Sequence, residues 1–200
     1  MTENQWRVCM DPRAIHDYHR FKKDPRRFRL LTVACLRMAL PPDPVVTPVL
    51  DAVEGYADGV ASRADFLVAR KQVRQAMKDR HRHADLLRRA TDDAMEGLSG
   101  AIEVGRGKYP KGGKAAECGL TRCVFGNPYR PTVFGPRWLT PTAVALAAGI
   151  YAERAFDRMP ILADAMEEAG CDEAEILQHC RGVEPHARGC WVVDALLKRG

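Results

Sequence analysis

The stretch Ser62–Val104 reads SRADFLVARKQVRQAMKDRHRHADLLRRATDDAMEGLSGAIEV and contains no proline. Its apolar residues recur every three or four positions, which is the spacing of one buried helix stripe. The stripe consists of Phe66, Ala69, Val73, Met77, Ala84, Leu87, Ala94 and Leu98. We expect this stretch to form either one long helix or a helical hairpin broken near residues 81–85.

The other side of this stretch is rich in cations, and more cations follow in the next segment. They are Arg70, Lys71, Arg74, Lys78, Arg82, Arg88, Arg89, Lys108, Lys111 and Lys114. One interpretation of this basic 63–114 face is a solvated helix surface. The alternative is a surface that binds nucleic acid, because contacts to phosphates need only cations within reach.

Residues 105–114 read GRGKYPKGGK and predict a flexible basic loop, because glycine and proline interrupt regular structure there. The loop departs from a nucleotide-binding P-loop at two positions. Lys108 stands where the first glycine is needed, and Ala115 replaces the hydroxyl residue that would bind magnesium.

Outside this stretch, helix starts are marked by a capping residue followed by proline. The pairs are Asp11-Pro12, Asp24-Pro25, Thr47-Pro48 and Thr140-Pro141. Apolar spacing predicts later helices at 141–154, 159–169, 173–181 and 188–198, with Asp172 as the cap of the third. No alternating strand of five or more residues is found. We therefore expect an all-α fold, a helical array with short connections.

Three segments organise the chain in this interpretation. Residues 1–106 form a helical N-terminal part with the basic helix or hairpin. Residues 107–123 form a flexible basic linker and a short helix, and residues 124–200 form a compact C-terminal helical module. Connections of two to six residues in that module favour neighbouring helices that pack closely.

The composition is that of a folded globular chain. Of the 200 residues, 46% are hydrophobic and 28% are charged, which excludes wholesale disorder. The formal net charge is +5, but residues 1–152 carry an excess of nine positive charges and residues 153–200 an excess of four negative charges. This asymmetry indicates either an anionic partner or neutralisation of one half by the other.

The chain contains seven cysteines and opens without a basic and then apolar signal segment. We therefore expect free thiols and a cytoplasmic location, because the cytoplasm is reducing. The longest uncharged stretch, 138–152, is too short for a membrane span of about 20 residues. No membrane association is expected.

A resemblance covers about residues 124–200. It is carried by VFGNPYRP at 124–131, WLTP at 138–141, IYAERAFDRMPILADA at 150–165, EAGC at 168–171, ILQHCRG at 176–182 and RGCWVVD at 188–194. These motifs resemble the C-terminal signature of a large paralogous family of uncharacterised proteins from planctomycete bacteria. The start of the chain is similar to that family's N-terminal part, whereas the Arg-rich segment 62–106 departs from its pattern. The resemblance implies no established activity.

Candidates for metal binding lie near the C-terminus: Cys171, Cys180, His186 and Cys190. Zinc needs four converging ligands, and only His186 and Cys190 have the short spacing of a zinc knuckle. Core thiols are the alternative, and no cofactor is expected. A cysteine nucleophile paired with His179 or His186 lacks an orienting carboxylate, so no enzyme is expected. His16 and His19, three apart on the first helix, are interpreted as surface residues.

The segment 125–138 concentrates aromatic residues outside any predicted helix. Its candidate partner-binding residues are Phe125, Tyr129, Arg130, Phe134 and Trp138. These residues either fasten the loop across the C-terminal helices or form a docking surface for another polypeptide, since Tyr, Trp and Arg are frequent interface anchors. The leading hypothesis is a non-enzymatic protein–protein interaction module. The alternatives are nucleic-acid binding through the basic face and a zinc- or thiol-dependent protein.

Overall fold

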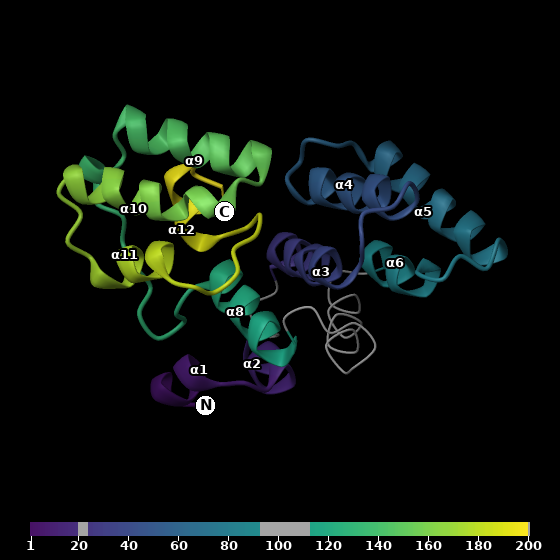
Figure 1. Ribbon diagram of the computed structural model, residues 1–200, viewed down its shortest axis with the longest axis horizontal. Helices are drawn as coiled ribbons and strands as arrows, with labels where there is room; N and C mark the ends of the chain where they lie inside the picture. The colour runs from purple at the N-terminus through teal and green to yellow at the C-terminus, as the bar shows by residue number, and fades with distance from the viewer. Residues whose placement is uncertain (20–23, 93–112, 200) are drawn as a thin grey trace. The chain divides into compact units, whose positions relative to one another are not determined.

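The computed structural model describes residues 1–19, 24–92 and 113–199 (Figure 1). Throughout these ranges the regular structure is helical and no strand occurs, so the predicted all-α fold is confirmed. None of the described helices is long and apolar enough to cross a bilayer. The chain divides into two compact units, Met1–Thr121 and Arg122–Gly200, and the second begins close to residue 124, where the C-terminal module is predicted to start.

The described helices of the first unit are α1 (Glu3–Val8), α2 (Pro12–His19), α3 (Pro25–Ala39), α4 (Val46–Ala57), α5 (Arg63–Lys78) and α6 (Ala84–Thr91), and α8 (Gly113–Phe125) runs on into the second unit. Asp24 caps α3 as predicted, because its carboxylate accepts a hydrogen bond from the backbone N–H of Arg27. The Thr47-Pro48 start is wrong by two residues, because α4 begins at Val46 and Val45 takes the N-cap position. Asp43 instead accepts hydrogen bonds from the N–H groups of Val45 and Val46.

The core of the first unit forms where α4 packs against α3, α5 and α6 (Figure 1). Its buried residues include Val33, Leu36, Val49, Leu50, Val53, Phe66, Val73 and Leu87. Helix α5 contributes only a narrow stripe to this core. Phe66, Ala69, Val73 and Ala76 are buried, and all its other residues are exposed.

The described part of 62–104 is a helical hairpin, the second of the two predicted forms. Helix α5 ends because Arg80 takes a left-handed conformation with φ 54°. The N–H of His81 then donates to the carbonyl of Ala76 at 2.8 Å, which closes the last turn. Helix α6 follows and packs against α5. Residues beyond 92 of the predicted stretch lie outside the described residues.

The second unit contains η2 (Pro136–Trp138), α9 (Pro141–Glu153), η3 (Phe156–Arg158), α10 (Met159–Glu168), α11 (Ala174–Arg181) and α12 (Trp191–Leu196). Helix α10 packs against α9 and α11, and α12 packs against α9. The predicted cap at Asp172 is wrong, since Glu173 takes the N-cap position and makes no side-chain capping bond. Helix α12 starts later than the predicted residue 188, because Gly189 has a φ of 87° and Cys190 is non-helical.

Candidate metal centre

The last turn of α8 carries Cys123, and the glycine after this helix permits a close approach to α12. Gly126 has a φ of 65°, a conformation that favours glycine. A Cβ at this position would lie 3.2 Å from Cγ of Trp191. Because Trp191 directly follows Cys190, the close packing brings Cys123 to the start of α12.

Two more elements complete the centre. His179 lies in the last turn of α11, and His186 lies in the connection from α11 to α12. That connection turns at Gly189 and is held by a hydrogen bond of 3.0 Å from the Cys190 N–H to the carbonyl of Ala187. The turn leaves Cys190 at the N-cap position of α12.

Four side chains from these segments of the second unit converge. One possible ligand atom from each of Cys123, His179, His186 and Cys190 lies within 4.8 Å of all the others. His179 Nε2 lies 3.2 Å from Cys190 Sγ, and Cys123 Sγ lies 3.5 Å from His186 Nδ1. Among the side chains that the structure describes, no second group of three or more His, Cys, Asp or Glu comes together in this way.

Two of the separations in the cluster suit a tetrahedral zinc ion. Zinc binds cysteine sulfur at about 2.3 Å and histidine nitrogen at about 2.0 Å, so tetrahedral angles set a sulfur and a nitrogen ligand about 3.5 Å apart. The two sulfur–nitrogen distances in the cluster are 3.2 and 3.5 Å. Two thiolates and two imidazoles are also a common donor set of structural zinc sites. The donor set therefore has the chemistry that zinc prefers, and two of its sulfur–nitrogen pairs have the separation of a tetrahedral shell.

The surroundings of the two cysteines favour different protonation states. Burial raises the pKa of the Cys123 thiol well above its usual value. Burial also opposes ionisation of Cys190, but a hydrogen bond with Cys123 and the neighbouring His179 hold the pKa of Cys190 well below its usual value. The cluster thus stabilises a thiolate, the form of cysteine that binds a metal.

The two histidines form the more open side of the cluster, since both are half-buried while Cys123 and Cys190 are buried. Their rings are perpendicular, with centroids 4.8 Å apart, and the ring of Trp191 lies 5.4 Å from that of His179. Nε2 of His186 is buried and has no hydrogen-bond partner among the described residues.

The structure brings together only half of the predicted metal-binding set. His186 and Cys190 belong to the cluster, whereas Cys171 and Cys180 are buried core thiols outside it. Their places are taken by Cys123 and His179. His179 lies within the candidate segment 171–190, so the sequence could have indicated it as a ligand. Cys123 lies far from that segment along the chain, and no local spacing marks it as a ligand.

The aromatic residues of the predicted docking loop point largely inward. Phe125 and Trp138 are buried, and Phe134 packs against the core of the second unit. The indole N–H of Trp138 donates to the carbonyl of Gly170 at 3.2 Å. Tyr129 is half-buried and Arg130 is exposed.

The predicted nucleic-acid-binding residues fall into three groups. Exposed on α5 or in the turn after it are Arg70, Lys71, Arg74, Lys78 and Arg82. Arg88 and Arg89 lie on α6 and form ion pairs with Asp85. Lys114 is exposed at the start of α8, while Lys108 and Lys111 lie outside the described residues.

No protein-family model, curated protein or solved structure matches this chain. The resemblance to the planctomycete family therefore stays a prediction.

Proposed function

We propose that residues 122–200 form a helical module that binds one structural Zn²⁺ through Cys123, His179, His186 and Cys190. The observation that carries the proposal is the convergence of these four donors within 4.8 Å of one another. Zinc is preferred over other metals because two thiolates with two imidazoles, arranged tetrahedrally, are a typical zinc set. Carboxylates, which would favour magnesium or calcium, are not part of the cluster.

The number of protein ligands supports a structural role for the metal. Catalytic zinc sites keep one coordination position open for water or substrate, whereas structural sites are closed by four protein ligands. A non-enzymatic role is therefore part of the proposal. A cytoplasmic location also belongs to it, supported by the seven cysteines, which are all free thiols.

The metal would tie together parts of the second unit that are far apart in the sequence. It would join the end of α8 to the end of α11 and to the start of α12. Binding energy at such a site is also folding energy, because the unfolded chain does not hold its ligands together. We expect removal of the metal to loosen these three helix ends first.

Metal analysis of the purified full-length protein tests the proposal. We expect one zinc per chain in the wild type and almost none after the double substitution Cys123→Ser with Cys190→Ser. Cys180→Ser is the matched control, because Cys180 is also fully buried in the same core and follows His179 directly, yet lies outside the cluster. This variant should keep its zinc.

A variant can lose its zinc because it no longer folds. A cobalt titration of the metal-free wild type tests the site without any substitution. Cobalt in the site should give the visible absorption of a tetrahedral ion together with thiolate-to-cobalt charge transfer. A wild-type chain that carries no zinc and develops no such absorption would overturn the proposal.

A further inference from the structure

Helix α5 of the first unit carries five cations on one exposed strip. At 100° per residue they fall within an arc of about 100°, and Leu67 is the only other residue in that arc. The five are Arg63, Arg70, Lys71, Arg74 and Lys78. We refer to them as the α5 basic face. All are exposed, since the buried stripe of α5 lies outside this arc.

The acids nearest to this face in the sequence are engaged elsewhere. Asp65 belongs to the capping box at the helix start, where it accepts hydrogen bonds from the backbone N–H and the hydroxyl of Ser62. Asp79, at the helix end, accepts a hydrogen bond from Gln75 at 3.0 Å. Within the described part of the chain, no ion pair or hydrogen bond involves the side chains of the α5 basic face.

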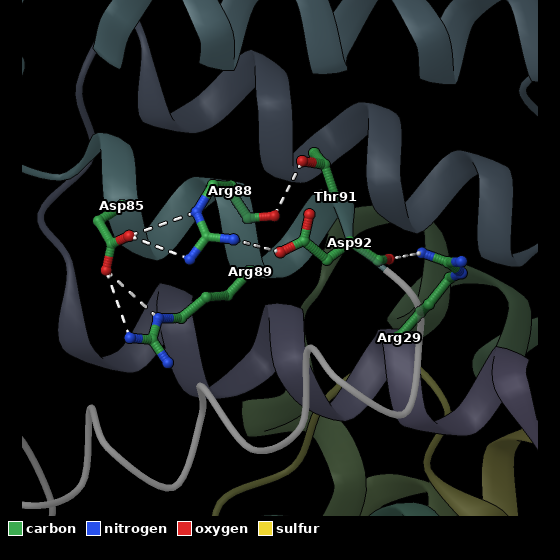
Figure 2. A network of polar contacts seen from close by, with 6 residues as sticks. All are labelled: Arg29, Asp85, Arg88, Arg89, Thr91 and Asp92. Atoms are coloured by element: carbon green, nitrogen blue, oxygen red, sulfur yellow. Dashed lines mark hydrogen bonds and ion pairs between the residues drawn. The ribbon is translucent and has the colours of Figure 1, made fainter.

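The neighbouring helix α6 provides an internal comparison. Figure 2 shows Arg88 between Asp85 and Asp92, with ion pairs of 3.3 and 2.9 Å, and Arg89 on the other oxygen of Asp85 at 3.4 Å. Arg29 donates to the backbone carbonyl of Asp92 at 3.1 Å. Arginines of α6 are thus neutralised by acids of the same segment, whereas the cations of α5 are left for an external anion.

The length of the face indicates a polyanion instead of a small ligand. At a rise of about 1.5 Å per residue, Arg63 and Lys78 lie about 22 Å apart along the helix axis, and Arg70, Arg74 and Lys78 follow at steps of about 6 Å. A single phosphate group cannot contact cations spread over that length. Duplex DNA offers one charge for about every 1.7 Å of its axis, so several phosphates would lie within reach.

The shape and chemistry of α5 favour a duplex over a single strand. Single-stranded nucleic acids are usually held by aromatic side chains that stack on bases. The α5 basic face has none, because Phe66 is buried and stacks on Tyr56 with ring centroids 4.4 Å apart. A helix about 10–12 Å wide fits the major groove of B-form DNA, which is about 12 Å wide, but not the narrow major groove of duplex RNA.

We propose that the α5 basic face binds double-stranded DNA through its phosphate backbone, with α5 lying in the major groove. The exposed surface of α5 on either side of the basic arc leaves the helix free to enter a groove. Binding does not depend on the metal centre, which belongs to the other unit.

Fluorescence anisotropy with a labelled DNA duplex of about 20 base pairs tests this proposal on the full-length chain. Five phosphate contacts should weaken binding about 500-fold between about 50 and 200 mM salt. The double substitution Arg70→Gln with Arg74→Gln should lower the salt slope by about two contacts and weaken binding at 50 mM salt by at least tenfold.

The matched control is Arg88→Gln with Arg89→Gln, which removes the same charge from the paired arginines of α6. This variant should bind within about threefold of the wild type, with circular dichroism confirming that both variants are folded. Equal weakening by the two double variants would reduce the effect to net charge and overturn the proposal. Absence of binding at low salt, or equal affinity for an RNA duplex of the same sequence, would also overturn it.

Discussion

A buried glutamate and a buried histidine lie together in the first unit, Glu117 on α8 and His16 on α2. Their exposed fractions are 1% and 2%, and Glu117 Oε1 lies 3.9 Å from His16 Nε2. The hydroxyl of Thr121 donates to the backbone carbonyl of Glu117, so its oxygen accepts from His16 Nε2–H at 2.9 Å. Burial lowers the pKa of His16 to about 4, although Asp11 acts in the opposite direction, so the imidazole is neutral near pH 7.

Glu117 should make the stability of the protein depend on pH. Burial raises its pKa to about 7, from 4.5. A carboxyl with a raised pKa in the folded state favours folding below the unfolded pKa, and this contribution is lost as the pH rises through 7. We expect Glu117→Gln to be more stable than the wild type at pH 8, by on the order of 2 kcal/mol, and to lose this advantage toward pH 5.

Urea denaturation of both proteins from pH 5 to pH 8 measures this difference in the free energy of unfolding. His16 is present in both, so its own titration, which lowers stability as the pH falls from 6.5 toward 4, contributes alike. Parallel stability curves over the whole range would show that Glu117 is already ionised in the folded state.

At the scale of elements, aromatic side chains of the segment between α8 and α9 pack into the core of the second unit. Trp138 in η2 is buried, and the ring of Phe134 meets it edge-on with centroids 6.3 Å apart. Gly135 lies close to the indole, since a Cβ there would lie 3.1 Å from Cε2 of Trp138 and would make the ring shift slightly. This packing favours a loop that is fastened across the C-terminal helices over a docking surface for another polypeptide.

Substitution of Trp138 separates that role from docking of a partner. We expect Trp138→Ala to destabilise the protein by about 3 kcal/mol, because it leaves a cavity and removes the hydrogen bond to the carbonyl of Gly170. Val133→Ala in the same segment is the control, because Val133 is 85% exposed and its truncation should cost less than about 0.5 kcal/mol. If thermal unfolding of Trp138→Ala matches that of the wild type, the ring belongs to a docking surface instead.

Short sequence patterns predict the helix starts better than they predict the four residues of the Cys/His cluster. Pairs such as Asp24-Pro25 and Thr140-Pro141 mark helix starts because capping and proline geometry act within one turn. His186 and Cys190 are close in sequence, so their pairing was also predictable. Cys123 joins them through the contact of Gly126 with Trp191, a tertiary contact that no local spacing encodes.

The same limit explains the error at His16. Because no third ligand is evident near His16 and His19, they are predicted to be surface residues, but contacts with Thr121 and Glu117 of α8 bury His16. The side chain of His19 lies outside the described residues. Burial of a polar residue on a short helix depends on what covers that helix, and this information is spread over the whole unit.

For the whole molecule, the two units differ in how their excess charge is paired. In the second unit Arg181 pairs with Asp164 and Glu167, both at 2.6 Å, so part of the acidic excess is neutralised locally. In the first unit the α5 basic face has no such partner among the described residues. The two proposals therefore belong to separate units: a metal-stabilised module at 122–200 and an anion-binding helix at 63–78.

X-ray absorption at the zinc edge of the purified full-length protein tests the central claim most directly, because it identifies the atoms bound to the metal. Ligation by Cys123, His179, His186 and Cys190 predicts a tetrahedral shell of two sulfur atoms at about 2.3 Å and two nitrogen atoms at about 2.0 Å. A protein that takes up no zinc, or a zinc shell made only of nitrogen and oxygen, would contradict it.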